Sequence, residues 1–259
     1  MRTFLKTAAP AMTLLLTAVV FSTTGEAHKA ITSKYTYNAD VLPIFVNRCG
    51  HCHIAGGVGP MSLVTYEEAF PWAESLRTEL LEAEEGDSGD FVKAAHRDLS
   101  ARELDIILDW AVGGTPQGDV SQAPQPMMFK NDWAGEKPDL VLQPAAAFQI
   151  PGDTMEITHD FVLPSGVARE RRISAIDLLP GTPAVVRDAT VFVRTPGAAP
   201  KIITNWTPRQ SPAAIAVKPG TALPQGAELI ARIHYKKTWK YEGQAMTDQS
   251  SLGIYFADK

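Results

Sequence analysis

Cysteine is scarce in this chain, which has only Cys49 and Cys52 among its 259 residues. A framework of several disulfides is therefore excluded. The chain also lacks an excess of basic residues, because its formal net charge is −5, and this argues against a nucleic-acid partner. It contains no recognisable internal repeat. The proportions of hydrophobic residues (45%) and charged residues (20%) are typical of a folded globular protein.

Long apolar runs are absent beyond the N-terminus. There, Arg2 and Lys6 precede an apolar run over residues 11–21, and the small residue Ala27 closes the segment. This order predicts a signal peptide over residues 1–27 that is cleaved during export to the periplasm. The alternative is an uncleaved membrane anchor, but a run of roughly a dozen residues is shorter than the ~20 that span a bilayer. The mature chain is therefore expected to have no transmembrane helix.

The two cysteines form one Cys-x-x-Cys pair, which is followed directly by His53. In an exported protein such a pair can be a disulfide, a redox dithiol or a metal clip. The histidine favours covalent haem attachment instead, in which two thiols meet two vinyl groups and the imidazole binds the iron. We therefore predict one covalent haem c on Cys49 and Cys52, with His53 as the proximal ligand of the iron.

The second axial ligand is harder to assign from the sequence. The motif resembles the class I cytochromes c, in which the distal methionine comes from a loop just before the last helix. Residues 93–100 occupy that place here, and they contain His96 but no methionine. The resemblance implies His96 as the distal ligand and places Met61, eight residues after His53, on the proximal face. Met61 is the alternative distal ligand, and Lys93 or an open site remain further possibilities.

Apolar residues at helical spacing mark the region around the cysteines. Asn38 is a predicted N-cap for a helix that ends near Cys49, and residues 65–83 form another predicted helix. A third helix is predicted to start at Ser100, because Ser100 and Glu103 fit a capping box. We therefore expect three helices around one haem.

Domain boundaries follow from changes in pattern along the chain. The helices predict an all-α, class I-like cytochrome c domain over residues 28–118. Prolines and polar residues over 119–136 indicate an extended linker. Short β-branched runs separated by turns then predict an antiparallel β-sandwich over residues 137–259. The runs are residues 140–142, 157–162, 184–193 and 227–235. The predicted fold class is accordingly α+β with two domains.

A longer series of motifs resembles bacterial proteins in which a cytochrome c precedes a domain of the copper type II, ascorbate-dependent monooxygenase family. The matching segments are Cys49–His53, Gly59–Tyr66, Asp109-Trp110, Lys137–Leu142, Ile233–Tyr235 and Asp248–Phe256. The resemblance implies a β-sandwich of the jelly-roll type from about Lys137 onward.

The copper sites of that family are built mainly from histidines, which suit both oxidation states of copper. Where the family has a His-His pair, this chain has Arg187-Asp188, and His234 keeps the position of a third ligand. The resemblance therefore implies a degenerate domain, in which copper is not expected. His234 is the one candidate copper ligand, and His28 would join it if the signal peptide is cleaved after Ala27.

These patterns favour an electron-transfer protein over an enzyme. The leading hypothesis is a periplasmic monohaem electron carrier, or an electron-transfer subunit of a larger complex. Its β-sandwich would dock to a redox partner protein or to a membrane electron-transfer complex. Two alternatives stay open: a copper-dependent monooxygenase fed by the haem, and a haem sensor or peroxidase with an open iron site.

Overall fold

The computed structural model describes residues 32–85, 99–126, 128, 130–133, 135–208 and 214–257. By their contacts, all of the described residues belong to one compact unit. The predicted signal peptide, His28, Lys93 and His96 lie outside the described residues. In the ranges that the structure describes, every helix is too short or too polar to cross a membrane.

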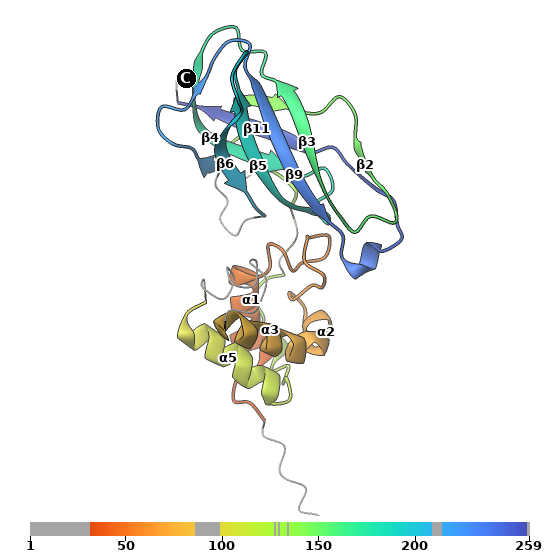
Figure 1. Cartoon of the computed structure of the whole chain (residues 1–259). Helices are drawn as coiled ribbons and strands as arrows, with labels where there is room; N and C mark the ends of the chain where they lie inside the picture. The colour runs from red at the N-terminus through yellow and green to blue at the C-terminus, as the bar shows by residue number, and fades with distance from the viewer. Residues whose placement is uncertain are drawn as a thin grey trace, which may run out of the picture. The chain divides into compact units, whose positions relative to one another are not determined.

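Helices and strands occupy separate stretches of the described chain (Figure 1). The helical elements are η1 (Tyr37–Val41), α1 (Leu42–Arg48), α2 (Tyr66–Ala69), η2 (Phe70–Trp72), α3 (Ala73–Glu85), α5 (Ala101–Val112) and η3 (Val120–Gln122). η1 is a π-helical turn, whereas η2 and η3 are 3-10 turns.

Sequence signals explain where these helices start and stop. The capping box at Ser100 is confirmed, because its hydroxyl accepts from the backbone N–H of Glu103 and its own N–H donates to the Glu103 carboxylate. The predicted helix over residues 65–83 is interrupted by a 3-10 turn that contains Pro71, which lacks an N–H for a regular α-helical bond. Asn38 is not an N-cap, because it lies inside η1 and donates to the carbonyl of Gly118.

The core of the helical stretch is aromatic. Tyr37, Phe45 and Trp110 are almost fully buried, and their ring centroids lie 5.9–6.3 Å apart in tilted or edge-to-face pairs. Each polar ring atom has a partner: Tyr37 Oη donates to the carbonyl of Leu63 at 2.8 Å, and Trp110 Nε1 donates to the carbonyl of Pro116 at 3.2 Å. This cluster holds η1, α1 and α5 together and reaches the loop that follows the cysteines.

The strands form antiparallel sheets. They are β1 (Leu140–Leu142), β2 (Phe148–Ile150), β3 (Glu156–Pro164), β4 (Arg171–Leu179), β5 (Val186–Arg194), β6 (Lys201–Trp206), β7 (Ile215–Ala216), β8 (Ala222–Leu223), β9 (Glu228–Lys236), β10 (Met246–Asp248) and β11 (Ser251–Phe256). One sheet has the order β1-β11-β4-β7, with β8 also paired to β4, and a second has the order β3-β9-β5-β6. β10 pairs with β2, and a 3-10 turn, η4 (Trp239–Tyr241), follows β9.

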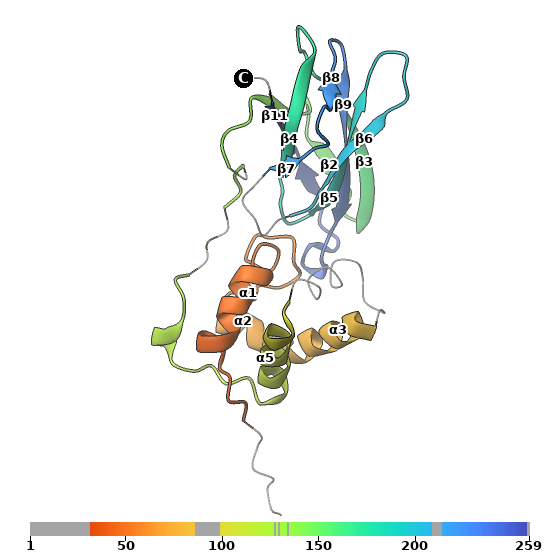
Figure 2. The ribbon, with the colours of Figure 1, turned by 90° about the vertical axis from the view of Figure 1, so that its left-hand side faces the viewer.

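The two larger sheets face each other across a shared apolar core (Figure 2). Ile176 and Ile254 from one sheet and Val191 and Leu229 from the other have no accessible surface. Burying side chains of this size contributes about 1.5–3 kcal/mol each. Exposed residues alternate with less exposed or buried residues along β3, as this packing requires.

One buried carboxylate fixes the end of this core. Asp248 is 1% exposed and accepts hydrogen bonds from Tyr235 Oη at 2.9 Å and from the N–H of Thr182 at 2.7 Å. It also accepts from the N–H and the hydroxyl of Ser250. Burial, with the nearby Asp248 charge, raises the pKa of Tyr235 above its ordinary value. The carboxylate therefore tolerates burial because several donors surround it.

The predicted fold class is wrong. We expected an all-α cytochrome c domain over residues 28–118 and, with it, an α+β protein of two domains. The described chain is instead mostly β, with eleven strands in antiparallel sheets, and its longest helices, α3 and α5, have only 13 and 12 residues. The helices stay short because glycine-rich and proline-rich stretches separate them. The β-rich C-terminal part agrees with the prediction.

Candidate functional site

The cysteines lie on a turn that continues from α1. The N–H of Cys49 donates to the carbonyl of Phe45 at 2.9 Å, so the cysteine caps the helix. The N–H groups of Cys52 and His53 then both donate to the carbonyl of Cys49, at 3.1 and 2.8 Å. Residues three apart in such a helical turn lie on the same side. The backbone therefore directs Cys49 and Cys52 to one side and places His53 directly after them.

A short loop encloses His53. The N–H of Gly59 donates to the carbonyl of Cys52 at 2.8 Å, and the N–H of Leu63 donates to the carbonyl of His53 at 2.9 Å. Between these contacts, the carbonyl of Met61 lies 3.2 Å from His53 Nδ1. A carbonyl oxygen only accepts, so Nδ1 carries the proton in this contact and Nε2 keeps its lone pair. The imidazole is thus held in the tautomer that can bind a metal through Nε2.

Gly59 makes this arrangement possible. A Cβ atom at position 59 would lie 2.8 Å from His53 Nδ1, 2.9 Å from His53 Cγ and 2.8 Å from the carbonyl oxygen of Cys52. Gly57 is similarly close, since a Cβ atom there would lie 2.5 Å from the same oxygen. The loop can therefore press its backbone against the imidazole only because these positions lack side chains.

Burial governs the electrostatics of this segment. Both cysteines are free thiols, and burial raises the pKa of Cys49 to about 12 and the pKa of Cys52 above its ordinary value. Burial also lowers the pKa of His53, an effect opposed by the Met61 carbonyl. A catalytic dithiol requires a lowered thiol pKa. The raised values disfavour the redox dithiol that the Cys-x-x-Cys pair would otherwise allow.

His51, inside the Cys-x-x-Cys pair, has no role that the sequence pattern predicts. Its Nδ1 atom is buried and has no hydrogen-bond partner among the described residues, and burial lowers its pKa. Burial therefore disfavours the charged form of this imidazole. The position within the Cys-x-x-Cys pair was visible in the sequence, but its burial was not.

The residues around the turn fit a covalently attached haem. Two free thiols share one side of the turn, and the imidazole of His53 is buried, correctly protonated and held by backbone contacts. The Met61 carbonyl lies on the Nδ1 side of the ring, away from Nε2, and the Met61 side chain packs against the core of the helical stretch. Position 96, the other distal candidate, is not among the described residues.

Carboxylates contact both ring nitrogens of His234, the candidate copper ligand. His234 Nδ1 lies 2.8 Å from Asp188 Oδ2, and its Nε2 lies 2.8 Å from Glu156 Oε1. Both ring nitrogens of His234 are thus within hydrogen-bond distance of a carboxylate oxygen, so a metal could bind either nitrogen only by breaking one of these contacts. Within the part of the chain that the structure describes, no three His, Cys, Asp or Glu side chains are placed to hold a metal ion.

The partners of His234 were missed because they come from two other strands. Thr158 on β3 and Asp188 on β5 both pair with His234 in the sheet register, and Glu156 lies on the same face of β3. Lys236 Nζ also contacts Glu156 Oε2 at 3.1 Å, and these contacts hold the pKa of Glu156 below its ordinary value. Cross-strand neighbours of this kind become visible only once the register is known.

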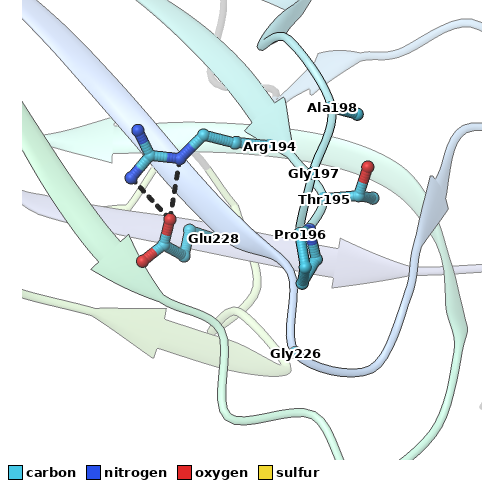
Figure 3. Close-up of a pocket in the computed structure, with 7 residues that line it drawn as sticks. All are labelled: Arg194, Thr195, Pro196, Gly197, Ala198, Gly226 and Glu228. Atoms are coloured by element: carbon cyan, nitrogen blue, oxygen red, sulfur yellow. Dashed lines mark hydrogen bonds and ion pairs between the residues drawn. The ribbon is translucent and has the colours of Figure 1, made fainter.

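A hollow lies at the end of β5 and β9 opposite to His234. It has a volume of about 410 Å³ and is lined by Arg194, Glu228, Gly226 and residues 195–198 (Figure 3). Arg194 Nε and Nη2 both contact Glu228 Oε2, at 2.8 and 2.6 Å. The ion pair leaves the second carboxylate oxygen of Glu228 pointing away from Arg194.

Comparisons with known proteins add no assignment, because neither a scan of protein-family models nor a search of curated proteins found a match.

Proposed function

We propose that this chain is an exported monohaem c-type cytochrome that carries single electrons in the periplasm. One observation carries the proposal: two free thiols on one side of a turn directly precede an imidazole whose Nε2 lone pair is preserved by the Met61 carbonyl. When bound, haem supplies a one-electron Fe(III)/Fe(II) couple. The export signal over residues 1–27 and the periplasmic location are part of the same proposal.

Cys49 and Cys52 attach the cofactor by forming two thioethers. On haem, each thiol would add across one vinyl double bond, so that sulfur would bond to one carbon and hydrogen to the other. This addition needs no oxidant, since a C–S and a C–H bond replace an S–H bond and a π bond. Buried thiols with a high pKa remain protonated near neutral pH, and this matches the S–H that the addition consumes.

His53 provides the proximal ligand. The hydrogen bond from its Nδ1 to the Met61 carbonyl fixes the orientation of the ring and makes Nε2 a stronger donor. The Gly59 backbone packs against the ring and limits its rotation. These contacts hold the imidazole in its binding orientation in the absence of the metal, which lowers the entropic cost of iron coordination.

We assign the distal position to His96, with Met61 as the alternative. The Met61 carbonyl lies on the side of the His53 ring opposite to Nε2, and this supports a proximal location for Met61. Substitution separates the two. We expect His96→Ala to open the ferrous iron to carbon monoxide, whereas Met61→Ala leaves the visible spectrum nearly unchanged. A sulfur-to-iron charge-transfer band that disappears in Met61→Ala would reverse the assignment.

Residues 137–259 are proposed to dock the cytochrome to a redox partner protein or to a membrane electron-transfer complex. The two carboxylate contacts of His234 support this non-catalytic role, because they occupy the nitrogens that copper would need. Metal analysis of the exported protein tests this point. Stoichiometric copper that is lost in His234→Ala would favour the monooxygenase alternative instead.

The decisive experiment is expression of the full chain with its own N-terminus in a bacterium that matures c-type cytochromes. We expect a mature protein that begins at His28, keeps haem under denaturing conditions and shows a one-electron potentiometric titration. Cys49→Ser/Cys52→Ser should lose covalent haem, while the matched histidine control His159→Ala should keep it. Mature wild-type protein without haem would contradict the proposal. Carbon monoxide binding to the wild type would favour a sensor or peroxidase.

A further inference from the structure

The Lys237 side chain is buried where the residues that follow β9 meet the loop between β2 and β3. Lys237 is 3% exposed, although lysine is almost never buried this fully without a partner. Its Nζ atom donates to the main-chain carbonyls of Pro151 at 2.5 Å and of Gln244 at 2.6 Å. A longer contact of 3.4 Å reaches the carbonyl of Gly152. An ammonium group has three N–H donors, so these three oxygens match its full hydrogen-bonding capacity.

The described partners of this ammonium group are all neutral. No carboxylate in the described ranges pairs with Lys237 Nζ, whereas the preceding Lys236 contacts Glu156 Oε2 at 3.1 Å. A buried charge needs compensation, which is usually an opposite charge. Main-chain carbonyl oxygens can take this role, as they do in the filters that replace the hydration shell of a potassium ion. The three oxygens around Nζ therefore have the composition of a site for a monovalent cation.

Backbone contacts hold the three oxygens close together. β2 pairs with β10 at Ile150 and Met246, which lie within two positions of the residues that carry these oxygens. The two loops can approach closely because residue 152 is a glycine, since a Cβ atom on Gly152 would lie only 2.7 Å from the carbonyl oxygen of Gly243. These contacts do not involve Nζ, so the oxygens should stay in place when the lysine side chain is shortened.

We propose that these three carbonyls form a binding site for an ammonium-type cation, and that the Lys237 side chain is its built-in occupant. A covalently attached group fills such a site without losing the translational freedom of a free ion. The occupant also has a structural effect. Lys237 and Gln244 flank the segment that contains η4, so the contact between them closes this segment, in which Trp239 is 58% exposed.

Shortening the side chain separates the site from its occupant. Lys237→Ala removes a three-carbon chain and its ammonium group, and n-propylammonium reproduces this missing part. The melting temperature of the full mature chain should fall by about 3–10 °C in Lys237→Ala, because buried carbonyls lose their charged donor. n-Propylammonium chloride should recover most of this loss and should saturate as a single site. Tetramethylammonium chloride at equal concentration should not, since it has the same charge but no N–H donor.

Two further proteins serve as controls. The wild type should respond equally to both salts, because its site is already filled. Lys236→Ala removes the neighbouring lysine, which contacts Glu156, and n-propylammonium should have no specific effect on it. If Lys237→Ala unfolds in buffer, circular dichroism shows which of the two salts restores the fold. Wild-type stability of Lys237→Ala, or an equal effect of both salts on it, overturns the proposal.

Nitrogen-15 NMR of the wild type tests the occupant directly. A hydrogen-bonded, buried ammonium group exchanges its protons slowly, so the Lys237 ammonium signal should be visible at neutral pH and absent from Lys237→Met. The exposed Lys240 should exchange too fast to be seen under the same conditions. A wild type without this signal, or a Lys237 nitrogen with the chemical shift of a neutral amine, would contradict the proposal.

Discussion

Replacement of Gly59 by alanine tests how the loop around His53 is built. The added Cβ would stand 2.8 Å from His53 Nδ1 and 2.8 Å from the carbonyl oxygen of Cys52, whereas ordinary contacts start near 3.4 Å. Either the imidazole or the loop must therefore move by about 0.6 Å. Overpacking of this kind costs about 1–3 kcal/mol. Movement of the loop would also lengthen the hydrogen bond between Nδ1 and the Met61 carbonyl, which is already 3.2 Å.

Two signals should therefore change together in Gly59→Ala. The melting temperature should fall by about 2–4 °C for each kcal/mol lost, as measured by circular dichroism. The haem absorption bands should shift, or the covalent haem content should fall, because the proximal imidazole is displaced. Both measurements use the mature, exported protein.

Gly181→Ala is the matched control. A Cβ atom at position 181 would lie 2.7 Å from the backbone nitrogen of Gln249, so the overpacking is of similar size. We expect a comparable loss of stability with an unchanged haem spectrum, because the clash lies among the strands. If Gly59→Ala keeps the wild-type spectrum and melting temperature, the proposed contact between the loop and the imidazole is wrong.

Three further substitutions test other contacts. Tyr37→Phe leaves the buried carbonyl of Leu63 without its donor, and denaturant unfolding should show a loss of about 1–3 kcal/mol, whereas unchanged stability would exclude this bond. Asp248→Asn puts an amide donor against buried N–H and O–H donors, with an expected loss of about 1–3 kcal/mol in the same assay. The N–H of Ser100 holds the pKa of the Glu103 carboxyl below its ordinary 4.5, so this contact stabilises the fold fully above pH 4.5 and less as pH falls through the lower folded-state pKa. The melting temperature between pH 5 and about pH 3 should therefore depend less on pH in Glu103→Gln than in the wild type. An equal dependence in both proteins would contradict this role of Glu103.

Local chemistry explains which elements the sequence could predict. The helix from Ser100 was predictable because the capping box involves residues only three positions apart. β1 lies at the predicted residues 140–142, since a β-branched run bounded by turn residues is also a local signal. β4 was not predicted, because its pairing with β11 joins residues more than seventy positions apart and its first residues, Arg171 and Arg172, indicate a solvated surface.

The fold class depended on the same long-range pairings. Helical spacing over residues 28–118 predicts an all-α domain, but Pro71 and the glycines after Cys52 keep the helices short. Several strands, among them β6, β10 and β11, are short or irregularly paired and carry weak local signals. Their place in the sheets is set by register, and a sequence pattern does not encode register directly.

At the candidate site, the sequence identified side chains but not backbone contacts. Cys49, Cys52 and His53 were found from their spacing alone. The family resemblance implied a proximal location for Met61, but the atom that contacts His53 is the Met61 main-chain oxygen. Every residue carries such an oxygen, so composition gives no indication of which one a folded loop will use.

The two ends of the helical stretch are bonded to each other. The N–H groups of Ser33, Tyr37 and Asn38 donate to the carbonyls of Gly113, Pro116 and Gln117 at 2.8–3.0 Å. The chain thus enters and leaves this stretch at neighbouring points. A segment with adjoining ends can be inserted into another gene, or lost from this one, with little rearrangement of its surroundings. Exchange between genes is therefore a structurally accessible route by which a helical stretch of this type can become joined to different domains.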